Sequence, residues 1–156
     1  MANKLLVAMD DSENALRAVE FVASSFNADS QITLFNVIQD TAAMCEMNSP
    51  ELTPYFKSQQ SSFCLLEDKK KDLVTQALQK GKQILMDAGF EEKNITIKSE
   101  LKKMGIARDI IKEAESGYTI IVMGKRGVSG IKDFLLGSIS QKVFNLAKDI
   151  SVLFVN

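Results

Sequence analysis

The chain has 156 residues, of which 46% are hydrophobic and 25% are charged, and its 19 basic and 20 acidic residues leave a net charge of −1. This length suits one domain, residues 1–156, and this composition is typical of a globular protein and not of a disordered or collagen-like chain. The balanced charge excludes a strong field for nucleic acid or an anionic membrane, and the lack of histidine excludes Ser-His-Asp triads and His-ligated zinc.

Five short apolar runs suit the buried strands of a parallel sheet. These runs are Lys4–Met9, Ile32–Ile38, Ile95–Leu101, Thr119–Met123 and Val152–Val155. Most of them are nearly continuously apolar, as expected for strands covered on both faces. The first run ends at Asp10 and Asp11, so it is too short for a signal peptide or a membrane span, and we expect a cytoplasmic protein.

Amphipathic stretches between the runs predict helices. One follows Ser12 as its N-cap, with an apolar face formed by Ala15, Val19, Val22 and Phe26. The others are Glu67–Ala88 with Leu73, Ala77, Ile84 and Ala88 as its face, Ala107–Ser116, and a helix that starts near Ser138 with a capping box to Gln141. The alternation of strands and helices predicts an open, mainly parallel α/β sheet with helices on both faces.

The long connection Gln39–Leu66 does not fit this alternation. It holds both prolines and both cysteines of the chain, and we expect a short helix after Pro54. Two interpretations stay open, a local cap over the sheet edge and a ligand lid or subunit contact. Because the first run leaves no room for an export signal, we expect Cys45 and Cys64 to be free thiols and not a disulfide.

A glycine-rich stretch follows the fourth strand. Four of the eight glycines fall within residues 124–137. Ligands of open α/β sheets bind beyond the carboxyl ends of the strands, glycine allows close approach of backbone N–H groups, and a helix N-terminus favours an anion. Lys125 and Arg126 add positive charge. The stretch therefore predicts a phosphate-binding loop, and the alternative is a mobile turn without a ligand.

Asp10 has two possible roles, and the other charged runs are expected to be solvated. Asp10, at the end of the first strand, is suited to bind a ribose hydroxyl or a hydrated Mg²⁺. Alternatively, Asp10 and Asp11 only complement the dipole of the first helix. The runs Glu67–Asp72 and Lys102-Lys103 are expected to be solvated faces. Neither G-x-x-x-x-G-K-[ST] nor G-x-G-x-x-G occurs, so neither a P-loop nor a dinucleotide-binding Rossmann site is expected.

Two motifs of the chain resemble those of the universal stress protein family. The resemblance extends over essentially the whole chain. The motifs are Val7-Ala8-Met9-Asp10 and Gly124-x2-Gly127-x9-Gly137-Ser138, and the second resembles the nucleotide-binding branch. The resemblance implies a Rossmann-like, five-stranded parallel sheet in the order 3-2-1-4-5. It also implies ATP or another adenine nucleotide as ligand, with or without Mg²⁺, and a homodimer paired through the C-terminal strand.

The resemblance also implies a set of site residues. Asp10 would contact the ribose and the main chain of Val37 the adenine. Ribose and phosphates would be surrounded by Gly124, Arg126, Gly127, Gly137, Ser138, Ile139 and Ser140, and Ala8, Met9 and Met123 would line the pocket. Two departures bear on phosphate affinity and on the dimer: Lys125-Arg126 replace the family's frequent small polar residue and histidine, and Ser151 replaces a common proline.

These features favour a stress-response protein that acts as a nucleotide-dependent switch or sensor. No general base is evident, so efficient catalysis is not expected, although slow ATP hydrolysis with Mg²⁺ and a positioned water stays open. One alternative is a family member that binds no nucleotide and acts through protein contacts. A phosphoacceptor receiver domain is disfavoured, because Lys102-Lys103 stand where an aspartate should end the third strand.

Overall fold

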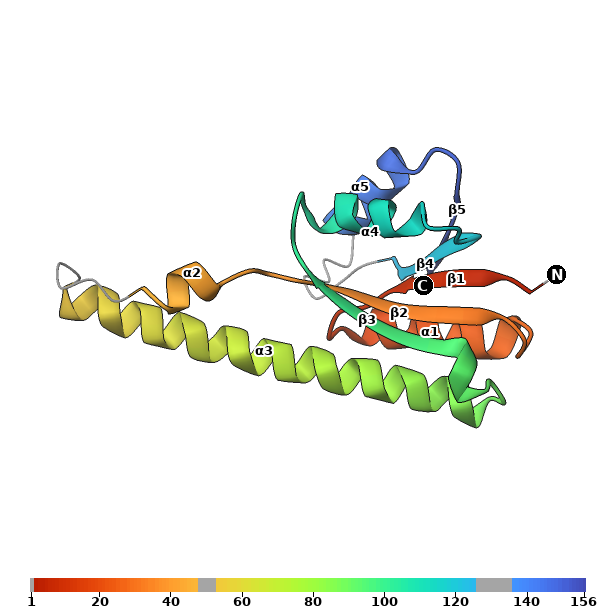
Figure 1. Cartoon of the computed structure of the whole chain (residues 1–156), viewed down its shortest axis with the longest axis horizontal. Coiled ribbons are helices and arrows are strands. Elements are labelled where there is room, and N and C mark those ends of the chain that lie inside the picture. Colours follow the sequence, from red (N-terminus) through yellow and green to blue (C-terminus); the bar gives the residue numbers. More distant parts are fainter. Residues whose placement is uncertain (1, 48–52, 126–135) are drawn as a thin grey trace.

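The computed structural model describes residues 2–47, 53–125 and 136–156, which form a five-stranded parallel sheet between two helical layers. The strands are β1 (Lys4–Ala8), β2 (Gln31–Ile38), β3 (Ile95–Leu101), β4 (Ile120–Gly124) and β5 (Ser151–Val155). Their order, β3-β2-β1-β4-β5, confirms the predicted fold class and strand order (Figure 1). Among the described residues, no helix has the length and apolar character that crossing a membrane requires.

The helices lie on both faces of the sheet, as predicted. They are α1 (Glu13–Ser25), α2 (Ala42–Cys45), α3 (Pro54–Asp87), the 3-10 turn η1 (Glu92–Asn94), α4 (Ile106–Ala114) and α5 (Ser138–Leu146). The pair α1 and α3 covers one face, and the pair α4 and α5 covers the other (Figure 1).

The central strand β1 is buried on both sides, which explains its continuous apolar run. Leu5 and Val7 belong to the core beneath α1 and α3, whereas Leu6 belongs to the core beneath α4 and α5. All three side chains are inaccessible to solvent. Strand β1 pairs with β2 on one side and β4 on the other, so the carboxyl ends of these three strands lie at one edge.

The start of α1 follows the sequence prediction. Ser12 is the N-cap, and its hydroxyl accepts a hydrogen bond of 3.2 Å from the N–H of Ala15. Ala15, Val19 and Val22 are buried against the sheet, and Phe26 packs at the edge of the same core. The spacing of four, three and four residues therefore identified the buried face correctly.

Helix α3 differs from the prediction, because it is one continuous helix of 34 residues beginning at Pro54. The separate short helix and the start at Glu67 were wrong. Thr53 caps the helix, Pro54 stands in its first turn, and neither glycine nor proline interrupts residues 55–80. Nothing in that stretch stops a helix once it has started.

The buried face of α3 was predicted only in part. Its buried residues are Val74, Ala77, Leu78, Gly81 and Leu85. Of the predicted apolar stripe, Ala77 is buried and Ile84 packs half-buried against the same core, whereas Leu73 and Ala88 are exposed. The small residues of α3 explain why its buried face differs from the predicted stripe. A Cβ at Gly81 would lie 3.2 Å from Leu34 Cδ1 and 3.4 Å from Val19 Cγ2, so glycine allows α3 to approach the sheet and α1 closely.

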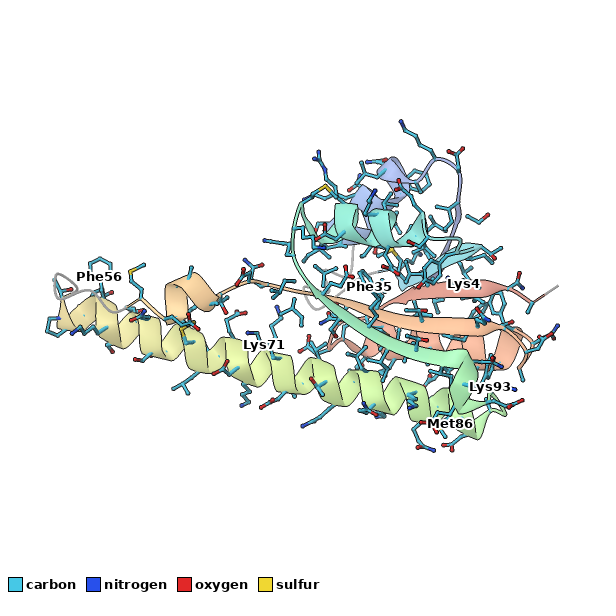
Figure 2. All side chains as sticks on the ribbon, viewed as in Figure 1. Lys4, Phe35, Phe56, Lys71, Met86 and Lys93 are labelled. Carbon is cyan, nitrogen blue, oxygen red and sulfur yellow. A yellow bond between two sulfur atoms is a disulfide. The ribbon has the colours of Figure 1, made fainter. Side chains whose placement is uncertain are left out.

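The N-terminal part of α3, residues 54–66, projects beyond the sheet and is called the arm below (Figure 1). Buried residues of α3 begin only at Val74. Phe56, which is 60% exposed, lies near the end of the arm farthest from the sheet (Figure 2). Within the described structure, the arm therefore contributes no buried residue to the core of the sheet.

A disulfide joins Cys45 at the end of α2 to Cys64 in the arm, with the two Cα atoms 5.9 Å apart. The expectation of free thiols was therefore wrong. The continuous helix brings Cys64 beside α2. Gln60 of the arm also contacts this region, because it donates hydrogen bonds to the carbonyl groups of Met44 and Met47. Helix α2 thus lies against the arm and not over the sheet edge (Figure 1).

We expect the disulfide to stabilise the arm locally and the sheet very little. Cys64→Ser should accelerate amide hydrogen exchange in α2 and residues 54–64, because opening of this region does not expose the core. The melting temperature should fall by less than about 3 °C. Hydrogen-exchange mass spectrometry and calorimetry would measure both effects, and wild-type protein treated with a dithiol should behave like the variant. Unchanged exchange, or a large loss of global stability, would contradict this account.

Candidate functional site

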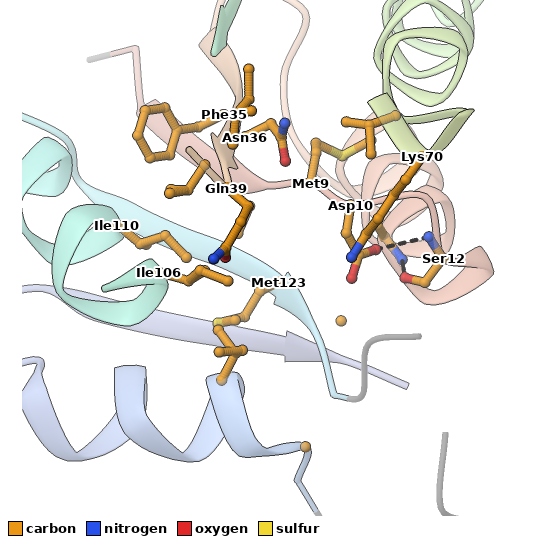
Figure 3. Close-up of a pocket in the computed structure, with 18 of the residues that line it drawn as sticks. Met9, Asp10, Ser12, Phe35, Asn36, Gln39, Lys70, Ile106, Ile110 and Met123 are labelled. Atoms are coloured by element: carbon orange, nitrogen blue, oxygen red, sulfur yellow. Dashed lines mark hydrogen bonds between the residues drawn. The ribbon is translucent and has the colours of Figure 1, made fainter. Parts of the chain in front are cut away.

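A cleft of about 320 Å³ opens at the carboxyl ends of β1, β2 and β4 (Figure 3). Strand β1 lies between β2 and β4, and the connections that follow β1 and β4 lead to α1 and α5, which cover opposite faces of the sheet. Ligands of open α/β sheets bind at such a switch point. The cleft also has the size of small-molecule sites.

The cleft brings together ten of the twelve residues that the sequence analysis assigned to the site. They are Ala8, Met9, Asp10, Val37, Met123, Gly124, Gly137, Ser138, Ile139 and Ser140. The other two, Arg126 and Gly127, lie outside the described residues. Segments that are far apart in the sequence therefore share one surface, which is formed by the ends of three strands and the start of α5.

Asp10 lies at the rim of this cleft and is half-buried. Its Oδ1 accepts a hydrogen bond of 2.8 Å from the N–H of Ser12, which forms an Asx turn and fixes the carboxylate direction. Within the described part of the chain, no other group donates to Asp10. Asp11, in contrast, is not among the residues of the cleft.

The first turn of α5 faces the cleft without a side-chain cap. Gly137 is the N-cap and Ser138 is the first helical residue, so the predicted capping box between Ser138 and Gln141 was wrong. Gln141 N–H instead donates to the carbonyl of Gly137 at 2.9 Å. Backbone N–H groups in an uncapped first turn have no side-chain acceptor, and together with the helix dipole they suit an anion.

Backbone and side-chain hydrogen bonds hold this turn against the end of β4. The hydroxyl of Ser140, which is 3% exposed, donates to the carbonyl of Gly124 at 2.9 Å. Gly137 N–H donates to the carbonyl of Lys125 at 2.7 Å, and Lys125 N–H donates to that of Val155 at 2.8 Å. Ser140 therefore positions α5, and its hydroxyl proton is already committed within the protein.

Gly124 also has a structural role that the sequence analysis missed. A Cβ at this position would lie 2.9 Å from Asn14 Cβ and 3.0 Å from the backbone carbonyl of Asn14. Helix α1 thus packs directly on the backbone of β4. Glycine is required here for helix–strand packing, independently of any ligand.

Several other residues of the cleft were missed. The apolar residues that were missed are Ala15, Phe35, Ile38, Val74, Ile106 and Ile110. The polar residues that were missed are Ser12, Asn36, Gln39, Glu67, Lys70 and Lys71. The rule that ligands bind beyond strand ends also points to the start of the next helix, which would have indicated Ile106 and Ile110. The residues of α3 carried no such signal.

The charged run 67–72 was predicted to be a solvated face, and this prediction was wrong in part. Glu67 is half-buried, and Lys70 and Lys71 are exposed, yet all three line the cleft. Their neighbours Asp68 and Lys69 do not line it. The correction follows from the course of α3, which continues beyond the carboxyl ends of the strands (Figure 1).

Asp109 fixes the start of α4, which carries Ile106 and Ile110 into the cleft. It is 7% exposed, and it accepts hydrogen bonds from Lys103 N–H at 2.8 Å and Met104 N–H at 3.1 Å. Burial raises the pKa of Asp109, but the backbone donors of Lys103, Met104 and Gly105, with the charge of Lys103, outweigh burial and hold this pKa below its ordinary value.

We expect Gly124→Ala to destabilise the protein through overpacking. The added Cβ would meet the backbone of α1, which cannot move as a side chain can, and overpacking typically costs about 1–3 kcal/mol. Urea unfolding of wild type and variant would measure the loss. Gly89→Ala is a contrasting variant, since its Cβ meets nothing within 4 Å and only its positive φ of 102° is strained. An unchanged unfolding free energy for Gly124→Ala would contradict the close approach.

We expect Asp109→Asn to lower stability in a pH-dependent way. A carboxylate with a lowered pKa stabilises the fold above its unfolded pKa of about 3.9, and this contribution is lost as pH falls through the lower folded pKa. The difference in unfolding free energy between wild type and variant should therefore be largest at neutral pH and shrink below about pH 4. Chemical unfolding at a series of pH values would test this, and a constant difference would contradict it.

Comparison with known proteins identifies the relatives of this chain. Residues 1–156 match the model of the Universal stress protein family. The chain is 30% identical over 149 residues to Universal stress protein YxiE of Bacillus subtilis, which covers 94% of this chain and 95% of that protein.

Solved structures show the same architecture. Hypothetical protein MJ0577 is 27% identical with a TM-score of 0.68, covering 99% of this chain and 96% of that one. Universal stress protein UspA of Lactobacillus plantarum is 20% identical with a TM-score of 0.69, covering 99% and 97%. A universal stress protein in complex with cAMP is 18% identical with a TM-score of 0.63, covering 99% and 97%. Since the family model spans the whole chain, this protein belongs to the universal stress protein family.

Proposed function

We propose that the protein binds an adenine nucleotide, ATP, ADP or AMP, in the cleft and acts as a nucleotide-dependent switch or sensor in a stress response. One observation carries the proposal. The carboxylate of Asp10, the uncapped first turn of α5 and an apolar wall meet in a single cleft at the switch point of the sheet. These groups match the ribose, phosphate and base of a nucleotide.

Each part of the ligand has a partner in this proposal. The adenine would lie against the main chain of Val37 and the apolar side chains of Ile106, Ile110 and Met123. The ribose hydroxyls would donate to Asp10, whose direction the Asx turn already fixes. The phosphates would lie at residues 124–140, where the described N–H groups of α5 and the sequence-assigned Arg126 and Gly127 would surround them.

The relatives support this assignment at the level of the fold. One structural neighbour is a universal stress protein in complex with cAMP, which is itself an adenine nucleotide. A Mg²⁺ ion accompanying ATP would be held mainly by phosphates and water, and no cluster of three His, Cys, Asp or Glu side chains gathers among the described residues. Asp10 is assigned to the ribose and the chain has no histidine, so hydrolysis is expected to be slow at most.

A second function is favoured by the arm. Tyr55, Phe56, Leu65 and Leu66 are 60–69% exposed there, and such side chains suit contacts with another protein. A family member that acts through protein contacts alone would keep this arm and bind no nucleotide. We also propose that this protein is located in the cytoplasm. The reducing conditions there would allow reduction of the Cys45–Cys64 disulfide.

We further propose a homodimer paired through β5. This strand is at the edge of the sheet, and Val152, Leu153 and Phe154 are only half-buried. An uncovered apolar edge is an association hazard, and pairing with its own copy around a two-fold axis would remove it.

Light scattering at micromolar concentration tests this assembly. We expect a mass of twice the 17.3 kDa of one chain, because two β5 strands would satisfy each other's free backbone groups. Cys45→Ser, at the end of α2, serves as a control that should leave the dimer intact. A strictly monomeric mass for wild type would contradict pairing through β5.

Substitution of Asp10 tests the nucleotide site. Asp10→Asn keeps an oxygen for the Ser12 N–H but removes the charge that a ribose hydroxyl would bind. Because hydrogen bonds to charged groups contribute about 1.5–3 kcal/mol, ATP affinity should fall by roughly 10- to 100-fold. Calorimetric titration with ATP would measure the change. ATP should also raise the melting temperature of wild type more than that of the variant.

Asp11→Asn is the matched control, since Asp11 is the adjacent carboxylate and does not line the cleft. Its ATP affinity should equal that of wild type. Absence of ATP binding to wild type would favour the protein-contact function. Equal affinity of wild type and Asp10→Asn would show that the nucleotide is not oriented by Asp10.

A further inference from the structure

Helix α3 contributes a charged surface to the cleft that neither the motifs nor the strand ends predict. Glu67, Lys70, Lys71 and Val74 of α3 all line the cleft. Lys70 extends from α3 toward the region of Asp10 and Ser12 (Figure 3). They reach the cleft from α3, which packs on the face of the sheet opposite to α5 (Figure 1).

The position of this surface is fixed by the buried half of α3. Glu67, Lys71 and Val74 are spaced by four and three residues, so they share one helix face. The same face continues into the core through Leu78 and Leu85, which are 4% and 0% exposed. Because the core holds this face against the sheet, the backbone that carries the two lysines cannot turn away from the cleft.

Both lysines lack an ionic partner within the described structure. Glu67 precedes them by three and four positions, where helical ion pairs normally form, yet no ion pair within 4.0 Å involves Lys70 or Lys71. Their ammonium groups therefore remain available to a ligand. Among the described residues, the other charged side chains of the cleft are the carboxylates of Asp10 and Glu67, which would repel an anion.

We propose that Lys70 and Lys71 bind the phosphate chain of the nucleotide and make the site selective for a nucleoside di- or triphosphate. This inference rests on the proposed nucleotide binding and adds the class of ligand. The partial positive charge at the start of α5, about half an elementary charge, does not offset two carboxylates by itself. The two lysine ammonium groups on the opposite wall offset the two carboxylates. A di- or triphosphate gains more from these ammonium groups than a monophosphate does, because it carries more negative charge.

Calorimetric titrations with adenosine, AMP and ATP test this proposal. The double variant Lys70→Gln/Lys71→Gln should weaken ATP binding by about 5- to 20-fold at low salt, since exposed charge pairs are modest individually. AMP binding should weaken less, and adenosine binding should not change. The ATP effect should shrink from about 20 mM to about 500 mM salt, because salt screens exposed charges.

Two further variants make the test specific. Lys69→Gln changes an adjacent lysine of α3 that does not line the cleft, so its ATP affinity should match that of wild type. Glu67→Gln removes a negative charge from the cleft and should tighten ATP binding by about 2- to 5-fold. Glutamine is a good helix former, so circular dichroism should show α3 intact in all variants.

The possible failures are distinguishable. If wild type binds ATP but the double variant binds it equally well, or loses adenosine affinity to the same extent, the phosphate role of the lysines is wrong and the proposed function stands. An equal loss in Lys69→Gln would overturn the role as well, since it would indicate a general charge effect. If wild type binds no adenine compound, the proposed function fails and this inference fails with it.

Discussion

The placement of β1 between β2 and β4 is the constraint on which the rest of the structure depends. Parallel pairing on both sides and burial of Leu5, Leu6 and Val7 fix this strand firmly. The connections after β1 and β4 then lead to opposite faces, so a cleft remains where the strands end. Asp10 leaves β1 at this point, and the first turn of α5 reaches it from the side of β4.

The residues of this cleft serve different physical purposes. Gly124 permits α1 to pack on β4, and Ser140 ties α5 to the carbonyl of Gly124. Asp10 and the first turn of α5 keep acceptor and donor capacity toward the cleft. The pattern of glycine and serine residues therefore combines the packing that shapes the cleft with the groups that would bind phosphate.

Local patterns predicted the parts of the fold that local forces determine. The strands, the Ser12 cap and the buried face of α1 follow from short apolar runs and spacing. The orientation of α3 does not, because Gly81 packs in the core without an apolar side chain that a pattern would detect. The length of α3 was missed although residues 55–80 hold neither glycine nor proline. The Cys45–Cys64 disulfide and the lysines of the cleft depend on that helix, so they were missed together. Arg126 and Gly127 stay sequence-based assignments.

The central claim is that the cleft at the ends of β1, β2 and β4 is a nucleotide site. The most direct test is an amide NMR titration of isotope-labelled protein with ATP. The account predicts that the largest shifts occur at Asp10, Val37, Ser138 and Ile139, while amides at the far end of the arm, such as Phe56, keep their positions. Saturating ATP that leaves the four cleft amides unshifted, or that shifts mainly the arm, would contradict it.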